Sequence, residues 1–168
     1  LATNYPYQPE VQKIFERVQN TVHNRITRSK LNIVKGRPNL GRFIAIALPD
    51  GDIILSKYVL TKFIYNQNVP EKLGNARLAF IIGHELSHVV HGDVLPKAFS
   101  GFSSSNEKAR EQEKQADEQG FLYAAMGGYA VDELFREKEG NFFVTWIKET
   151  DAKWGIKTSH PSAKKRAK

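Results

Sequence analysis

The chain has 168 residues, of which 40% are hydrophobic and 26% are charged, proportions typical of a folded globular domain. Its apolar runs are far shorter than the roughly 18 residues that span a bilayer. Cysteine is absent, which excludes disulfides, thiolate nucleophiles, iron–sulfur clusters and cysteine-ligated zinc fingers. Any bound metal must therefore be held by the 5 histidines and 18 carboxylates.

The net charge of +7 is concentrated in a few stretches rather than spread over the chain. Residues 157–168 contain five basic residues and no acid, and residues 25–42 form a second basic stretch without an acid. Such runs are usually solvated surface or a tail, with phosphate or anionic lipid as the alternative ligand. No recognised nucleic-acid module accompanies them, so we expect no nucleic-acid partner.

The N-terminal part of the chain predicts one helix and a few short strands. Residues 1–8 read as an irregular lead-in. From Pro9 to about Arg28, apolar residues recur at helical spacing, which predicts a helix with one buried face. Residues 32–35 and 42–48 are strand-like segments separated by glycine and proline.

The middle of the chain predicts a hairpin and two helices. Phe43 to Leu55 reads as two short strands around a Pro-Asp-Gly turn. Ser56 is an expected N-cap for a helix to about Tyr65. Pro70 opens a long helical pattern that continues to about His91.

The remaining segments predict further helices with loops between them. Gly92 to Asn106 is a loop rich in glycine and serine, followed by a helix from Glu107 to about Met126. Two shorter amphipathic stretches, residues 131–139 and 141–154, precede the basic tail at residues 157–168. Taken together, the pattern predicts one α+β domain over residues 1–168, mainly helical with a small sheet.

The sequence His84-Glu-Leu-Ser-His88 lies inside the long helical pattern. Residues four apart leave the same face of a helix one turn apart, so two neutral imidazoles can reach one zinc ion. Glu85 lies about 100° round the helix, where a carboxylate can exchange a proton with a water that the metal activates. A random sequence of this composition contains this H-E-x-x-H arrangement roughly one time in a hundred. Its apolar flanks make a buried metal site the favoured interpretation.

A catalytic zinc site needs a third protein ligand and an open position. The helix predicted after residue 106 offers four candidate acids, Glu107, Glu111, Glu113 and Glu118. Of these, Glu113 is followed one turn later by Asp117, an acid that can orient a ligating histidine. We therefore predict Glu113 as the third ligand and Asp117 as the hydrogen-bond partner of a histidine ring. His91 is three residues after His88, and we interpret it as a second-shell or helix C-terminal residue.

These motifs resemble the zinc metallopeptidase family of HtpX and the CAAX prenyl protease, a branch of the gluzincins. The hairpin Ala45 to Ser56 is similar to the strand signature of that family, and Glu113 to Gly120 matches its Glu-x-x-Ala-Asp-x-x-Gly. Thr158-Ser-His-Pro161 with Arg166 is similar to its closing His-Pro…Arg segment. The resemblance implies a zincin-like fold with the small sheet at the rim of the active site. Ile44 and Asp50 depart from the signature.

The resemblance implies a zinc-dependent endopeptidase that binds one Zn²⁺ per chain and acts on protein or peptide substrates. It assigns His160 to stabilising the oxyanion, with a fourth-ligand role as the alternative, and Arg166 to tying the tail to nearby carboxylates. The edge formed by Ala45, Ile46, Ala47 and Leu48 can pair with an extended substrate. The rival from another class is a zinc-bound chaperone or scaffold without hydrolytic activity.

The resemblance also bears on where the protein acts. The membrane helices of the family are missing from the chain, so relatives in the cell envelope that act on misfolded or outer-membrane proteins are the better analogy. We expect an envelope or periplasmic location, or membrane association through segments outside this chain, with the cytoplasm as the alternative. The oligomeric state is not predicted.

Overall fold

The computed structural model describes residues 5–22, 29–35, 45–93 and 106–136, without the side chains of 106, 107, 109 and 110. In chain order it contains α1 (Gln8–Gln19), β1 (Leu31–Val34), β2 (Ala45–Ala47), β3 (Ile53–Ser56), α2 (Lys57–Val59), the π-helix η1 (Leu60–Ile64), α3 (Glu71–His91), α4 (Asn106–Met126) and α5 (Glu133–Arg136). The predicted α+β class with a small sheet is confirmed. Within the described residues, no helix is both long and apolar enough to cross a membrane. A single domain over residues 1–168 stays a prediction.

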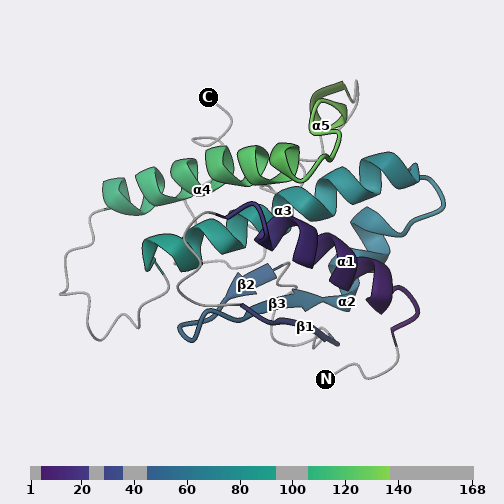
Figure 1. Ribbon diagram of the computed structural model, residues 1–168, viewed down its shortest axis with the longest axis horizontal. Helices are drawn as coiled ribbons and strands as arrows, with labels where there is room; N and C mark the ends of the chain where they lie inside the picture. Colours follow the sequence, from purple (N-terminus) through teal and green to yellow (C-terminus); the bar gives the residue numbers. More distant parts are fainter. Residues whose placement is uncertain (1–4, 23–28, 36–44, 94–105, 137–168) are drawn as a thin grey trace.

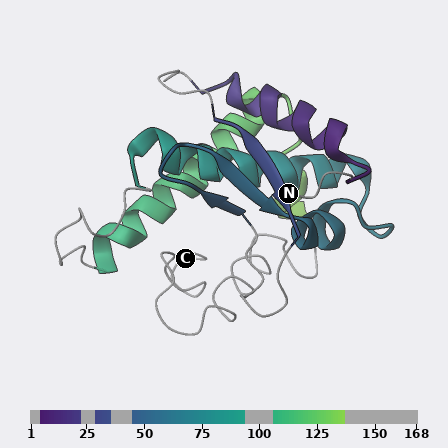
Figure 2. The ribbon, with the colours of Figure 1, turned by 90° about the horizontal axis from the view of Figure 1, so that it is seen from below.

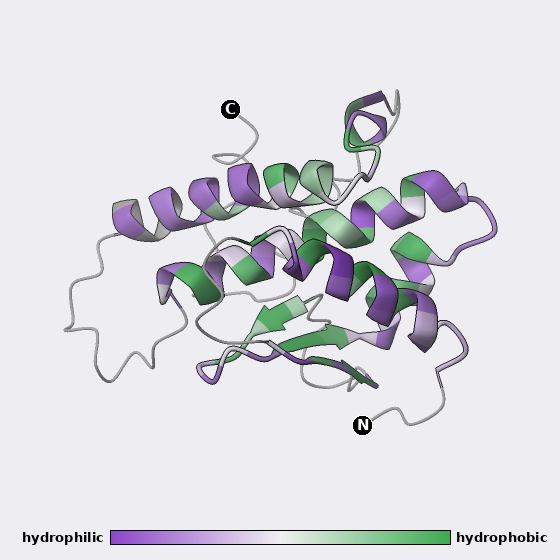
Figure 3. Cartoon of the chain, in the orientation of Figure 1, coloured by the Kyte–Doolittle hydropathy of each residue, from purple (hydrophilic) through white to green (hydrophobic). Residues whose placement is uncertain are grey.

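Helix α3 is the central element of the fold. It packs against α4 on one side and against the sheet and η1 on the other, with α1 alongside (Figures 1 and 2). Its residues from Ala76 to His88 are all buried, as expected for a helix that is apolar around most of its circumference. Helix α4 differs from α3, because its N-terminal half is mainly hydrophilic and its C-terminal half is apolar (Figure 3). Among the described helices, the His84–His88 motif therefore lies on the one with the longest buried stretch.

The sheet has the strand order β1-β3-β2, with β3 in the centre. The predicted hairpin is confirmed, because β2 and β3 pair antiparallel and Leu48 N–H donates to Asp52 O at 2.8 Å. Gly51 has φ 89° in this turn, a conformation that favours glycine. Strand β1 pairs with β3 in parallel, Leu31 opposite Ile53, a pairing that the sequence did not predict.

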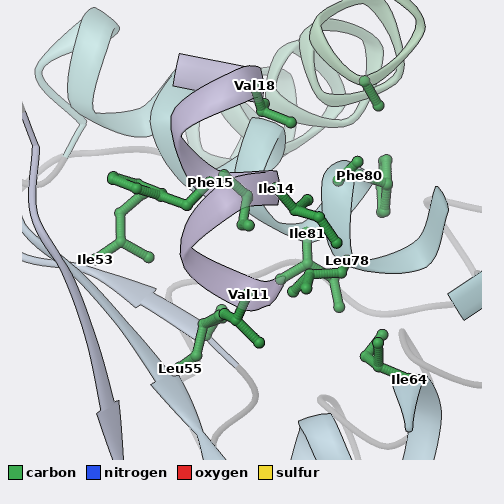
Figure 4. Close-up of a cluster of buried hydrophobic side chains, with 14 of the residues drawn as sticks. Val11, Ile14, Phe15, Val18, Ile53, Leu55, Ile64, Leu78, Phe80 and Ile81 are labelled. Atoms are coloured by element: carbon green, nitrogen blue, oxygen red, sulfur yellow. The ribbon is translucent and has the colours of Figure 1, made fainter. Parts of the chain in front are cut away.

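The core lies between α1, the sheet and α3. Buried side chains on one face of α1 pack against Ile53 and Leu55 of β3 and against apolar residues of α3 (Figure 4). The α1 residues in this face are Val11, Ile14, Phe15 and Val18. Their spacing is the helical period on which the prediction of this helix rested. The core thereby fixes the sheet beneath the metal motif of α3.

Helix α1 ends at Gln19, nine residues before the predicted end near Arg28, so that boundary was wrong. After Gln19 the backbone hydrogen bonds span three residues instead of four, from Thr21 N–H to Val18 O and from Val22 N–H to Gln19 O. The Thr21 hydroxyl also donates to Val18 O at 2.7 Å and takes a carbonyl that the helix would otherwise use. Val22 is buried but no longer helical.

Two of the other helices agree closely with the sequence, whereas α5 begins at Glu133, two residues after the start of the predicted stretch 131–139, whose end lies outside the described residues. Helices α3 and α4 match their predicted spans to within one residue. Ser56 is the N-cap of α2, where its Oγ accepts from Val59 N–H at 3.3 Å. The helix that follows winds into a π-helix, which was not predicted. The loop at residues 94–105 and the stretch 141–154 lie outside the described residues.

Candidate metal centre

Two imidazoles of α3 face one point. His84 and His88 leave the same side of the helix one turn apart, and their Nε2 atoms lie 3.1 Å from each other. Both rings are buried, His84 completely. At this distance the two nitrogens must share a proton or a metal ion, because two lone pairs facing each other inside the protein would be unfavourable.

Glu113 of α4 completes the group. Its Oε2 lies 3.5 Å from His84 Nε2, and its Oε1 lies 3.3 Å from His88 Nε2. Within the described residues, His84, His88 and Glu113 form the cluster able to hold a metal ion. The predicted ligand set is thus brought together from two helices.

Two glycines allow the helices to approach closely enough for this contact. A Cβ on Gly83 would lie 2.9 Å from Gly120 O, and a Cβ on Gly120 would lie 3.0 Å from His84 N. The first distance is shorter than real Cβ contacts, and the second is tighter than most of them, so a side chain at either position would push the helices apart. The absence of both side chains therefore brings Glu113 within reach of the histidines.

The side chains of the cluster lie at distances that suit a zinc ion. A tetrahedral site with bonds of 2.0–2.1 Å places its ligand atoms about 3.4 Å apart. The two Nε2 atoms are 3.1 Å apart, and the contacts of His88 with Glu113 Oε1 and of His84 with Glu113 Oε2, at 3.3 and 3.5 Å, also lie near this value. Two imidazole nitrogens and one carboxylate are also a usual donor set for catalytic zinc. The residues present therefore fit this metal.

In each histidine of the cluster, the ring nitrogen Nδ1 contacts a carboxylate. Asp117 Oδ1 lies 2.9 Å from His84 Nδ1, the contact that the sequence predicted. Asp93 Oδ2 lies 3.2 Å from His88 Nδ1. An acceptor at Nδ1 keeps the ring proton there and leaves Nε2 as the metal-binding nitrogen. The role of Asp93 was missed by the sequence analysis.

Glu85 points toward the sheet. Its carboxylate is 3% exposed, and its Oε2 accepts a hydrogen bond from Ala47 N–H at 2.9 Å. Glu85 is not part of the three-residue cluster that could hold a metal ion. The structure therefore separates this carboxylate from the metal ligands, as its position on the helix predicted.

Strand β2 presents backbone groups on the side away from β3. Leu48 bonds to Asp52 across the hairpin, and hydrogen-bonded pairs alternate along an antiparallel ladder. Ile46 therefore faces β3, whereas the backbone groups of Ala45 and Ala47 point the other way. The bond from Ala47 to Glu85 agrees with this alternation. Leu48 itself lies in the turn, beyond the end of the strand.

The pKa of His88 is strongly perturbed. Burial, the largest single effect, lowers it, but hydrogen bonds to Asp93 and Glu113 and the negative charges of Glu85 and Glu113 outweigh burial and raise the pKa from 6.5 to about 10. Without a metal, the site therefore holds a proton where zinc would bind.

His91 lies at the end of α3, near the cluster. Its Nδ1 lies 2.8 Å from Ser87 O, so this nitrogen donates, and its Nε2 accepts from Gln115 of α4 at 3.1 Å. These bonds join the two helices and agree with the helix C-terminal interpretation of this residue. His160 and Arg166 lie outside the described residues, so their assigned roles stay predictions.

Comparison with known proteins identifies the class as a peptidase. The model of Peptidase family M48 matches residues 7–105, and that of Peptidase U49 matches residues 63–168. Each match covers more than half of the chain. The chain belongs to the zinc metallopeptidase family of the HtpX and CAAX protease type.

The two matches overlap over residues 63–105, which contain both histidines of the cluster, whereas Glu113 lies in the Peptidase U49 match alone. No curated protein and no solved structure matches the chain. The zincin-like arrangement therefore stays a prediction.

Proposed function

We propose that the chain is a zinc-dependent endopeptidase that hydrolyses peptide bonds in protein substrates. One zinc ion per chain is held by His84, His88 and Glu113. The observation that carries this proposal is the buried cluster itself, in which the two Nε2 atoms lie 3.1 Å apart and each is within 3.5 Å of an oxygen of Glu113, close to the edge length of a zinc tetrahedron. Membership of a peptidase family supports the same reaction.

Glu85 performs the proton transfer. Zinc at this position supplies Lewis acidity, which polarises a substrate carbonyl and lowers the pKa of a water molecule. Glu85 accepts the proton of the attacking water and passes it to the leaving amine. Because Ala47 N–H holds Oε2, we assign the transfer to Oε1.

Strand β2 binds the substrate through its backbone. An extended peptide that lies along the side of β2 away from β3 can pair with both backbone groups of Ala45 and with the carbonyl of Ala47. The N–H of Ala47 is engaged by Glu85. Substrate binding and the orientation of the base therefore share one residue, which brings the peptide beside the proton acceptor.

His160 is proposed as the group that stabilises the negative charge on the substrate oxygen. This assignment follows from the similarity of Thr158-Ser-His-Pro161 to the closing segment of the family. A histidine that donates to the developing oxyanion contributes only as the charge forms. Arg166 is assigned to anchoring the tail that carries it.

The test combines metal analysis with hydrolysis of casein. We expect about one zinc per chain and hydrolysis that a chelator abolishes and added zinc restores. Glu85→Gln keeps the size of the side chain but cannot take the proton. We expect this variant to keep its zinc and to lose at least about a hundredfold in hydrolysis.

The same variant separates the endopeptidase from the scaffold alternative. A zinc-bound chaperone needs the metal ligands but not the Glu85 carboxylate. Zinc-loaded protein without hydrolysis, or hydrolysis unchanged in Glu85→Gln, would contradict the endopeptidase assignment. Glu118→Gln, an exposed carboxylate on α4, is the matched control and should behave as the parent protein.

A further inference from the structure

Helix α3 ends in a motif that returns the chain toward the metal cluster. Gly92 adopts the left-handed conformation, with φ 68°. Its N–H donates to Val89 O at 3.2 Å, and the N–H of Asp93 donates to His88 O at 3.0 Å. These two bonds are those of a Schellman motif. The backbone of Asp93 is thereby attached to the residue whose ring its carboxylate contacts.

The two carboxylate oxygens of Asp93 serve different helices. Oδ2 lies 3.2 Å from His88 Nδ1 on α3, and Oδ1 accepts from Gln112 Nε2 on α4 at 2.6 Å. The Asp93 side chain is only 11% exposed, so both bonds are largely shielded from water. Gln112 directly precedes Glu113 on α4. The chain His88–Asp93–Gln112 therefore connects one proposed ligand to the turn that carries another.

We propose that Asp93 and Gln112 form a positioning pair that fixes the ring of His88 for zinc. The inference rests on the proposed function, because it takes His88 as a ligand. Asp117 of α4 orients His84 directly, whereas α4 orients His88 through the Gln112–Asp93 bridge. The two proposed ligand histidines of α3 are thus aligned from the helix that supplies the third ligand.

The test changes which member of the pair donates the hydrogen bond and which accepts it. Gln112→Glu places two carboxylates against each other and removes the donor to Asp93. We expect zinc to bind this variant about 10- to 100-fold more weakly, the usual effect of changes behind a ligand. Adding Asp93→Asn restores one donor facing one acceptor, and the Asn carbonyl still accepts from His88. The double variant should regain most of the lost affinity.

Asp93→Asn alone should have a small effect, because the Gln112 amide can turn over and present its oxygen. Gln119→Glu is the matched control for charge, since it makes the same substitution two turns further along α4. Zinc affinity is measured by competition with a chromophoric chelator, and thermal unfolding of each metal-free variant reports folding separately. If Gln112→Glu fails to fold, Asp93→Ala takes its place, with Asp132→Ala as its control and the same expected loss.

The outcomes separate the inference from the proposed function. Weak binding in Gln112→Glu that Asp93→Asn rescues supports the pair. The pair is overturned if the parent binds zinc normally and Gln112→Glu binds it no more weakly than Gln119→Glu. It is also overturned if the double variant regains no affinity. In both cases the proposed metal site is unaffected. If Asp93→Ala is used instead, a zinc affinity within about twofold of that of the Asp132→Ala control also overturns the proposed pair. A parent chain that binds no zinc overturns the proposed function and this inference together.

Discussion

His88 is the buried residue at which a proton and a metal compete. Hydrogen bonds that its ring donates to two carboxylates, together with their negative charges, raise its pKa in the metal-free protein from 6.5 to about 10, against the effect of burial. Because the folded-state pKa lies above the unfolded value, this proton stabilises the metal-free fold fully below about pH 6.5. The stabilisation is lost as the pH rises through about 10.

The same competition predicts how zinc affinity depends on pH. Zinc must displace the proton of His88, so affinity should rise about tenfold per pH unit between pH 7 and pH 9. Calorimetry in buffers of different ionisation enthalpy should detect about one proton released per zinc over this range. Affinity that is constant from pH 7 to pH 9 would contradict the position of His88 as a ligand.

Glu113 is expected to be indispensable for the metal. Glu113→Ala removes a carboxylate that is 2% exposed and lies between the two imidazoles. The loss of zinc affinity should exceed the about 10- to 100-fold typical of changes behind a ligand. Glu111→Ala, an exposed neighbour on the same helix, should leave affinity unchanged when both are titrated with zinc. Full zinc binding by Glu113→Ala would require a different third ligand.

Spacing along the sequence was enough to predict the ligand histidines but not all of their partners. His84 and His88 are related by helix geometry, which is local, and Asp117 is one helical turn from Glu113. Asp93 reaches His88 only because Gly92 turns the chain back through a left-handed conformation. A glycine directly after a helical pattern is the signal for that turn, and it makes the residue that follows a candidate partner for a histidine in the last turns of the helix.

At the scale of the elements, the crossing of α3 and α4 determines the metal cluster. Alanine normally favours a helix over glycine by about 1 kcal/mol. At Gly120, however, a Cβ would meet His84 N at 3.0 Å and Phe80 O at 3.1 Å, and backbone atoms cannot move aside as a flexible side chain can. Overpacking of this kind costs about 1–3 kcal/mol, so the clash should dominate.

We therefore predict that Gly120→Ala lowers the free energy of unfolding and also weakens zinc binding, because the helices must separate. Chemical denaturation of the metal-free protein and a zinc titration measure the two effects. Gln119→Ala, next to it on α4, is the control and should change neither by much. A Gly120→Ala variant that is more stable and binds zinc normally would show that the close approach is unnecessary.

The sequence predicted the helices that carry the site better than it predicted the elements around them. α3 and α4 have strong local signals, a proline at the start of α3 and glycines after each helix. The premature end of α1 depends on a threonine hydroxyl that competes for one carbonyl, which periodicity does not register. The parallel pairing of β1 with β3 depends on the packing of α1 over both strands, a tertiary effect.

For the molecule as a whole, zinc is expected to act as a cross-link in a chain without cysteine. A ligand that binds only the folded state at 100 times its dissociation constant adds about 2.7 kcal/mol of stability. For a domain of this size that corresponds to a rise in Tm of roughly 5–10 °C. Differential scanning calorimetry with zinc and with chelator measures the shift, and Glu113→Ala should abolish it. An equal Tm in both conditions would argue against a structural contribution of the metal.

The proposed pairing of substrates with the side of β2 away from β3 has a consequence for which proteins would be cut. Recognition through the peptide groups of Ala45 and Ala47 reads no side chain, so it cannot distinguish one sequence from another. It does distinguish conformations, because a native domain has already paired its own backbone and offers no extended segment. Susceptibility should therefore follow the fraction of time that a potential substrate spends unfolded, and the enzyme would sort proteins by their stability rather than by their identity.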